Sequence, residues 1–337
     1  DVAIMSIGAL SVPVYETNSP AQVKMIFNDA NVKMAFAEDD FQRDKIESVR
    51  DQCPDLGDVY IIGLGAIDTI IEYGRAVSDA EFLEREQAVK GSDLATIVYT
   101  SGSTGTPKGV ELTHANFVFI TYSGVNSMPD IAMKPNRRLL LFLPLAHVFA
   151  RYMQFFCFAG NVSLGLSSNL KTILADFKAF KPTFILAVPR IFEKIYNAAS
   201  QKAGAGFKGR VFADATQTAY DWSHAQQSGG SIPLALNAKH ALYNKLVYSS
   251  IMEVFGGHVE YAVSGGAPLD SSIAHFFNGV GLPLLEGYGM TETCAPSSVN
   301  PTEGYKIGTI GLPLQGVTMG VDEEGELCIK SPAVCAG

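Results

Sequence analysis

Short apolar runs alternate with segments of helical spacing over most of the chain. Leu94 to Tyr99 and Phe184 to Val188 are continuous apolar runs of strand length, which is typical of strands buried on both faces. Segments such as 170–180 repeat their apolar residues at helical spacing instead. This alternation predicts an α/β fold in which mostly parallel sheets are flanked by helices.

Capping residues fix several helix starts. Ser19 and Pro20 predict a helix to about Ala30, Ser78 with Glu81 forms a capping box, and Thr113 can cap a helix to about Ser127. We expect further strands at 34–37, 59–62, 138–143, 162–166, 259–264 and 283–288, and further helices at 39–50, 146–159, 170–180, 270–280 and over most of 189–257.

Residues 316–330 predict a β hairpin that turns over 322–325, and we take 316–337 as the start of a small β region. A polar, glycine-rich stretch at 228–233 predicts a turn between helices. The expected layout is one large domain over 1–337, with α/β subregions at about 1–257 and 258–315.

Composition and charge narrow the class of protein. The 337 residues are 47% hydrophobic and 18% charged, which is typical of a globular protein with a large interior. The net charge of −9, with no block of Lys and Arg to offset it, excludes a nucleic-acid binder. A negative total charge is compatible with ATP binding, because local N–H groups and cations set the field at a site.

The five cysteines have neither a Cys-x-x-Cys pair nor zinc-ligand spacing. An odd number of scattered cysteines predicts reduced thiols packed in the core and a cytoplasmic protein. The longest apolar stretch, Leu139 to Leu166, is interrupted by Pro144, His147 and Arg151, so we do not expect a membrane span there. Peripheral contact with the inner face of the membrane stays open.

The segment from Tyr99 to Gly109 carries the strongest chemical signal, since glycines, hydroxyl residues and Lys108 follow a predicted buried strand. Glycines let successive backbone N–H groups approach an anion, and the hydroxyls and the lysine add donors and positive charge. The segment therefore predicts a polyphosphate site.

Two other phosphate-binding motifs do not match the sequence. A Walker A loop counted from Gly102 would need its second glycine where Pro107 stands. The Gly63 to Asp68 stretch has an aspartate where a dinucleotide fingerprint needs a small residue, so we interpret it as a strand-to-helix turn.

The glycine-rich segment resembles the signature of the adenylate-forming enzymes, the superfamily of acyl-CoA synthetases, luciferases and peptide-synthetase adenylation domains. Further segments resemble the same superfamily in the same order: Leu143 to Arg151, Ser264 to Leu269, Glu286 to Thr293, and Gly325 to Lys330. The resemblance thus extends over most of the chain.

The resemblance implies a role for each matching residue. Lys108 and the residues Thr100, Ser101, Gly102, Ser103, Thr104, Gly105 and Thr106 would hold the β- and γ-phosphates of ATP. Gly266, Ala267 and Pro268 would lie along the adenine, Tyr288 would stack on it, and Glu286, Gly287 and Gly289 belong to the same nucleotide site. Thr291 would donate to the α-phosphate and Glu292 would hold Mg²⁺.

The resemblance also implies which residues contact the carboxylic acid substrate. His147 would lie beside the acyl carboxylate, and Gly265 and Gly289 would also border the substrate. We do not take His147 as a general base, because a carboxylic acid is already ionised at neutral pH. Arg151 is an ion-pair candidate, and Arg190, Met290 and the cysteines are expected to have structural roles.

The acyl group is the hardest part to predict. Tyr261 to Gly266 has no acidic residue that could pair with an amino-acid ammonium, and Tyr152 to Phe158 could line a hydrophobic tunnel or pack in the core. Pro189 to Tyr196 looks like the helix start found in long-chain acyl-CoA synthetases, which favours a long-chain fatty acid.

The resemblance implies a long-chain fatty acid–CoA ligase that uses ATP, Mg²⁺ and CoA. A fatty acyl-AMP ligase and an aryl- or medium-chain acid–CoA ligase are alternatives within the superfamily. The family's ribose-binding aspartate, its hinge and its C-terminal lid domain with the adenylation lysine are not found in 1–337. We therefore expect this segment alone to be inactive, and an inactive nucleotide-binding fragment is the remaining alternative.

Overall fold

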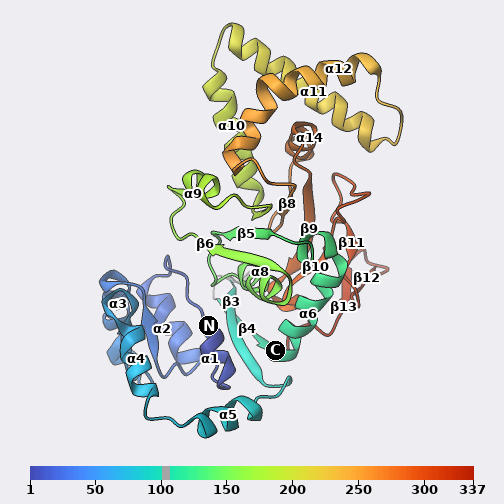
Figure 1. Ribbon diagram of the computed structural model, residues 1–337. Helices are drawn as coiled ribbons and strands as arrows, with labels where there is room; N and C mark the ends of the chain where they lie inside the picture. The colour runs from blue at the N-terminus through green and yellow to red at the C-terminus, as the bar shows by residue number, and fades with distance from the viewer. Residues whose placement is uncertain (101–106) are drawn as a thin grey trace. The chain divides into compact units, whose positions relative to one another are not determined.

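A computed structural model describes residues 1–100 and 107–337. These residues form two compact units (Figure 1). Unit 1 comprises 1–118, 145–148 and 333–337, and unit 2 comprises 119–144 and 149–332. Each unit has its own sheets, and each is described by itself.

Unit 1 begins with helices and two parallel strands, most of which the sequence pattern predicts. Its first elements are α1 (Val2–Ser6), α2 (Pro20–Asp29), β1 (Ala35–Ala37), α3 (Asp40–Glu47), β2 (Val59–Ile61), α4 (Ala66–Gly74) and α5 (Asp79–Ala88). Ser19 and Gln22 close a capping box on α2, and the Ser78 side chain accepts from the Glu81 N–H at the start of α5. β1 pairs with β2 in parallel, and Val23, Ile26, Phe27 and Ile46 lie in the small core of this region.

An antiparallel hairpin completes unit 1. β3 (Leu94–Thr100) pairs with β4 (Lys108–Thr113), with Tyr99 opposite Gly109 and Thr100 opposite Lys108. β3 was predicted, whereas β4 was missed because its charged residues mask the alternation of Val110 and Leu112. The C-terminal residues lie along β4, since the Glu111 N–H donates to the Gly337 carbonyl at 2.9 Å.

Unit 2 contains a seven-stranded sheet in the order β11-β10-β9-β8-β7-β5-β6 (Figure 1). Its strands are β5 (Arg137–Leu141), β6 (Val162–Leu166), β7 (Phe184–Ala187), β8 (Tyr261–Ser264), β9 (Leu284–Met290), β10 (Ala295–Val299) and β11 (Leu312–Pro313). The first five are parallel, and β10 and β11 add an antiparallel edge that the sequence pattern did not predict. The predicted hairpin of β12 (Thr318–Val321) and β13 (Leu327–Lys330) is confirmed.

Helices surround the sheet of unit 2. They are α7 (Pro129–Ala132), α8 (Val148–Ala159), α9 (Ile173–Phe180), α10 (Pro189–Ala203), α11 (Phe207–Gln227), α12 (Leu234–Tyr243), α13 (Ser249–Met252) and α14 (Ser271–Val280), while α6 (His114–Ser127) begins in unit 1 and continues into unit 2. The hydroxyl of Thr113 accepts from the Asn116 N–H at 3.2 Å, as the predicted cap of α6 requires.

The core of unit 2 lies between the sheet and its helices. Phe192 on α10 and Phe276 and Phe277 on α14 are fully buried. α11 approaches α14 so closely that a Cβ on Gly279 would lie 2.2 Å from the Ala219 carbonyl oxygen. Glycine at this position therefore allows the two helices to pack backbone to backbone.

The thiols are all free, and Cys53, Cys157 and Cys294 are buried as expected. The prediction of packing was wrong for Cys328, which is exposed on β13, and for Met290, whose side chain is 40% exposed. Cys328 lies in a two-stranded sheet, and Met290 is the last residue of β9, so both side chains can point to water. Among the described residues, no helix combines the length and the apolar character needed to cross a bilayer.

Candidate functional site

In unit 1, two predicted phosphate-binding residues flank the glycine-rich segment. Thr100 ends β3 and Lys108 begins β4, and the two residues are paired across the hairpin. Residues Ser101, Gly102, Ser103, Thr104, Gly105 and Thr106 lie outside the described part of the chain. The Lys108 side chain is exposed, so its ammonium is free to meet a phosphate.

The hairpin is anchored where it leaves the core. The Tyr99 hydroxyl donates to the Asp29 carboxylate at 2.5 Å, and burial raises the pKa of Tyr99. A Cβ on Gly109 would lie 2.7 Å from the Ile97 side chain. Tyr99 and Gly109 thus form a closely packed pair next to the pair of Thr100 and Lys108 in the hairpin.

His147 lies in the short segment of unit 1 that precedes α8. Its side chain is exposed over part of its surface, and desolvation by the surrounding protein lowers its pKa. The imidazole is therefore neutral at about pH 7 and can donate a hydrogen bond without carrying charge.

In unit 2, two predicted motifs meet at one edge of the sheet. β8 and β9 are parallel neighbours with Ser264 opposite Glu286, so Gly265, Ala267 and Pro268 leave β8 beside the predicted nucleotide segment of β9. Ligands of α/β proteins bind outside the carboxyl ends of parallel strands. Gly266 has φ of +81°, a conformation that favours glycine at this turn.

The Glu286 carboxylate connects these two motifs. One of its oxygens accepts from the Leu269 N–H at 3.2 Å, and the Glu286 carbonyl accepts from the Asn300 N–H at 2.8 Å. Burial raises the pKa of Glu286, and backbone hydrogen bonds from Leu269 and Gly308 partly oppose that shift. The geometry favours a positioning role for Glu286, since its carboxylate is already engaged by the backbone.

A pH-dependent stability effect follows for Glu286→Gln. Because burial raises the folded pKa of Glu286 above its ordinary value, the wild type loses stability as pH rises through the folded pKa. Glutamine keeps an acceptor for Leu269 without the charge. We expect the variant to be more stable than the wild type at about pH 7, with the difference closing below the unfolded pKa. Thermal denaturation over this pH range measures the effect, and a variant less stable at neutral pH would contradict it.

The next residues of β9 run directly against β10. A Cβ on Gly287 would lie 3.0 Å from the Ser298 carbonyl oxygen, and one on Gly289 would lie 1.9 Å from that of Ala295. Tyr288 between them is half-buried, and its hydroxyl lies 3.6 Å from the Met290 sulfur. The two glycines thus let β10 pair closely with β9 and leave part of the Tyr288 ring free for a ligand.

A one-turn 3₁₀ helix, η5 (Thr291–Thr293), joins β9 to β10. The Thr293 hydroxyl accepts from the Met290 N–H at 3.1 Å, and Cys294 and Ala295 follow with φ of 55° and 91°. A positive φ at an alanine is strained backbone, which the surrounding structure must hold in place. The strained residues lie two and three positions after Glu292.

Thr291 and Glu292 are the polar groups that this turn presents. Thr291 is half-buried, and the exposed Glu292 carboxylate has no hydrogen bond or ion pair with another described residue. No cluster of three potential metal ligands occurs among 1–100 and 107–337. This donor set fits Mg²⁺, which commonly binds one or two carboxylates together with substrate phosphates and water.

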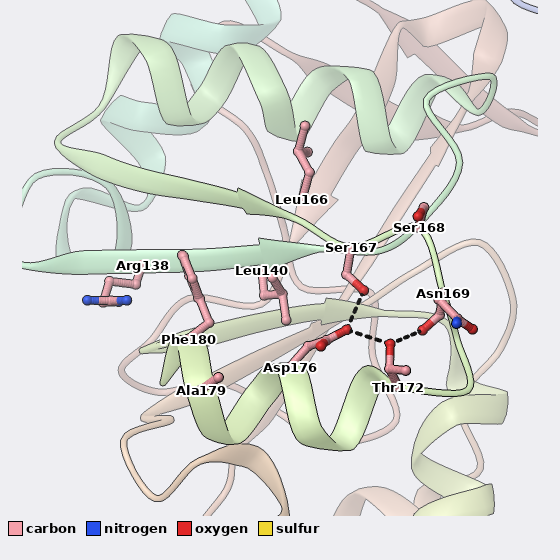
Figure 2. A pocket seen from close by; sticks show the side chains of 10 residues that line it. All are labelled: Arg138, Leu140, Leu166, Ser167, Ser168, Asn169, Thr172, Asp176, Ala179 and Phe180. Atoms are coloured by element: carbon pink, nitrogen blue, oxygen red, sulfur yellow. Dashed lines mark hydrogen bonds between the residues drawn. The ribbon is translucent and has the colours of Figure 1, made fainter. Parts of the chain in front are cut away.

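A cavity of about 510 Å³ lies elsewhere in unit 2, against β5 and α9 (Figure 2). Leu140, Leu166 and Phe180 supply apolar walls, and the Asp176 carboxylate accepts from Ser167 at 2.7 Å and from Thr172 at 3.0 Å. None of its lining residues comes from α8. Arg138, Ser168 and Asn169 also line the cavity, so it offers both apolar and polar walls.

Helix α8 packs in the core instead of lining this cavity. Tyr152, Met153 and Phe156 are at most 3% exposed. Arg151 is fully buried, and desolvation lowers its pKa to about 10, so it stays charged at neutral pH. Tyr152 and Phe156 thus follow the core-packing alternative of the sequence analysis, whereas Phe158 is 59% exposed.

The model of the AMP-binding enzyme family matches residues 1–337. The chain belongs to this family. It is 41% identical to the long-chain-fatty-acid–CoA ligase FadD15 of Mycobacterium tuberculosis, in an alignment that covers all of this chain and 56% of the relative. It is 30% identical to long chain acyl-CoA synthetase 3 of Arabidopsis thaliana, in an alignment that covers 98% of this chain and 53% of the relative. The chain therefore spans about half the length of these curated relatives.

Solved structures share the fold of this AMP-binding chain. The N-terminal domain of FACL13 from Mycobacterium tuberculosis aligns with a TM-score of 0.66 at 18% identity, over 98% of this chain and 72% of that one. The Bacillus subtilis O-succinylbenzoate coenzyme A synthetase, solved with ATP and magnesium, aligns with a TM-score of 0.64 at 17% identity, over 100% of this chain and 58% of that one. The predicted α/β fold of the adenylate-forming N-terminal domain is confirmed.

Sequence reasoning missed two features of the candidate site. The contact between Glu286 and Leu269 joins motifs 17 residues apart, and nothing in the sequence marks Glu286 as a backbone acceptor. The strained Cys294 and Ala295 carry no glycine that would have signalled positive φ. The second feature lies at the start of β10, which was itself not predicted.

Proposed function

We propose that the protein containing this chain activates a long-chain fatty acid with ATP and transfers it to CoA. The observation that carries this proposal is the end of β9 and the turn that follows it, which present Tyr288, Thr291 and Glu292 within five residues at the carboxyl edge of parallel strands. The identity to long-chain-fatty-acid–CoA ligases supports the substrate class.

In the first step, a carboxylate oxygen of the fatty acid attacks the α-phosphate of ATP. A new P–O bond forms, the bond to pyrophosphate breaks, and the products are acyl-AMP and pyrophosphate. The transition state spreads negative charge over the phosphate oxygens, so donors and cations around it lower the barrier. In the second step the CoA thiol loses its proton and attacks the acyl carbonyl, and AMP leaves as the thioester forms.

The residues of this chain would share that work. Lys108 and residues 100–106 would hold the β- and γ-phosphates, and Gly266, Ala267 and Pro268 would lie along the adenine under Tyr288. Thr291 would donate to the α-phosphate, and His147, neutral at about pH 7, would donate to the acyl carboxylate. Glu292 would hold Mg²⁺, which supplies positive charge to the phosphates. Glu286 would position the Gly265 turn.

We propose a cytoplasmic location with peripheral contact to the inner face of the membrane. Five free thiols, one of them exposed at Cys328, support a reducing compartment. We also propose that residues 1–337 belong to one N-terminal domain of a larger enzyme.

Product formation by the full-length protein tests this function. The protein is incubated with Mg·ATP, CoA and acids from acetate to palmitate, together with benzoate. Acyl-CoA formed preferentially from the long acids is the expected result. Acyl-AMP that accumulates without thioester would indicate a fatty acyl-AMP ligase, a preference for benzoate or shorter acids would indicate the other CoA ligases, and no pyrophosphate release would leave an inactive nucleotide-binding protein.

Lys108→Ala is expected to slow adenylation by about 10- to 100-fold, because a charge-assisted contact to the departing pyrophosphate is lost. ATP–pyrophosphate exchange in the full-length protein measures the step without CoA. Lys90→Ala removes another exposed lysine of unit 1 and serves as the control. Equal rates for both variants would exclude the phosphate role of Lys108.

A further inference from the structure

A buried asparagine closes the loop between β10 and β11. Asn300 directly follows β10 and is 3% exposed. Its Nδ2 group donates to the Thr309 carbonyl at 2.6 Å, and its Oδ1 atom accepts from the Lys306 N–H at 2.9 Å. The side chain therefore uses both its donor and its acceptor to fix the path of residues 300–309.

The loop returns to its own start. Gly311 has φ of +78°, and a Cβ on this residue would lie 2.1 Å from the Asn300 nitrogen. The Ser298 hydroxyl donates to the Ile310 carbonyl at 2.9 Å, which holds the returning chain against β10. Because the positive φ and the close approach both require glycine at 311, the loop is built for one closed conformation.

The closed loop contacts both the carbonyl and the carboxylate of Glu286. The Glu286 carbonyl accepts from the Asn300 backbone N–H at 2.8 Å and from the Asn300 Nδ2 group at 3.4 Å. Near the other end of the loop, the Gly308 N–H donates to the Glu286 carboxylate, which also accepts from the Leu269 N–H. Glu286 is thus held between this loop and the turn that follows β8.

The same loop is fastened to helices on its other side. The Tyr305 hydroxyl donates to Oδ1 of Asn278, which is a buried residue of α14. The Ile307 N–H donates at 3.1 Å to Oε1 of Gln227, the last residue of α11. These two bonds fix the loop without touching Glu286, so the contribution of Asn300 can be separated from the general order of the loop.

From these contacts we propose that Asn300 is a positioning residue for the adenine of ATP, because it shapes the loop that holds Glu286, and Glu286 in turn holds the turn at 265–268. This inference rests on the proposed function, in which that turn lies along the adenine. Tyr288, which would stack on the base, lies two residues beyond Glu286 on the same strand. The loss of Asn300 should therefore weaken nucleotide binding more than it slows the reaction of the bound complex.

Asn300→Ala in the full-length protein tests the proposal. In ATP–pyrophosphate exchange, we expect the KM for ATP to rise by about 10-fold and kcat to fall by less than about 3-fold. Calorimetric titration with AMP needs no turnover and should show a similar weakening, by about 10-fold. A residue that only stabilised the fold would not produce this separation of KM from kcat in protein that remains folded.

Asn300→Asp distinguishes hydrogen bonding from packing. Aspartate has nearly the same volume and keeps an acceptor for the Lys306 N–H, but it turns an oxygen toward the carbonyls of Thr309 and Glu286. We expect AMP binding at least as weak as that of Asn300→Ala, because two acceptors then lose their donor and face a negative charge. If packing alone mattered, aspartate would bind AMP like the wild type.

Tyr305→Phe is the matched control within the same loop. It removes the hydrogen bond to Asn278 and leaves every bond of Asn300 in place. Tyr305→Phe and Asn300→Ala each leave buried groups without a partner, so both should melt a few degrees below the wild type. Only Asn300→Ala should change the KM for ATP and the affinity for AMP.

Three results would overturn the proposal: AMP affinity and ATP KM of Asn300→Ala equal to those of the wild type, an equal loss of affinity in Tyr305→Phe, or wild-type affinity in Asn300→Asp. A wild type that binds AMP more tightly than Asn300→Ala but catalyses no exchange with any acid would count against the proposed function alone. A wild type that does not bind AMP would overturn both.

Discussion

Gly289→Ala is expected to destabilise the protein by about 1–3 kcal/mol and to abolish most adenylation activity. The new Cβ would lie 1.9 Å from the Ala295 carbonyl oxygen and 2.6 Å from its carbon, so the backbone of β10 would have to move. That movement would displace η5 and with it Thr291 and Glu292. Thermal denaturation and ATP–pyrophosphate exchange by the full-length protein measure the two effects.

Gly320→Ala is the matched control for this substitution. Gly320 also lies in an antiparallel strand, β12, but no atom lies within 4 Å of its hypothetical Cβ. Alanine should be tolerated there, with a change of less than about 1 kcal/mol in either direction. Equal stability of the two variants would show that the β10 backbone can move away from position 289 at little cost. The close contact would then not explain why glycine occupies this position.

Glu292→Gln is expected to lower the rate of adenylation by about 100-fold and to raise the Mg²⁺ concentration needed for half-maximal rate. An amide still accepts a hydrogen bond but lacks the charge that attracts a hard cation. Because the Glu292 side chain is exposed, the fold should be unaffected. Titration of ATP–pyrophosphate exchange with Mg²⁺ measures the change.

Glu323→Gln gives the comparison for the loss of one carboxylate. Glu323 is exposed in the turn between β12 and β13, where the family resemblance implies no metal role. The Mg²⁺ dependence of the Glu323→Gln variant should equal that of the wild type. An unchanged Mg²⁺ dependence in Glu292→Gln as well would exclude Glu292 as the metal ligand.

Local signals in the sequence predicted most helices and parallel strands well. The caps at Ser19, Ser78 and Thr113 gave helix starts that the structure confirms, because a side-chain acceptor three residues before an N–H acts within one turn. The continuous apolar runs of β3 and β7 likewise were found, since burial on both faces removes polar residues from the strand itself.

Elements whose character depends on distant neighbours were missed. All five residues of β10 are buried, yet Ser297 and Ser298 make the run polar, and only pairing with β9 and β11 makes it a strand. β4 also depends on its partner, because Lys108 and Glu111 interrupt its apolar residues. Hydrogen bonds to other strands stabilise such segments, and local composition does not reveal them.

The sequence by itself determined the α/β class, the order of the family's motifs and the residue types suited to phosphate and Mg²⁺, because these follow from local pattern and side-chain chemistry. Tertiary structure alone decided that Glu286 holds the Gly265 turn through Leu269 and that Gly289 must lack a side chain beneath β10. It also decided that Asn300 closes the loop after β10 beside Glu286. Each of these depends on which backbone atoms the fold brings within a few ångströms, and that information is carried by contacts between distant segments.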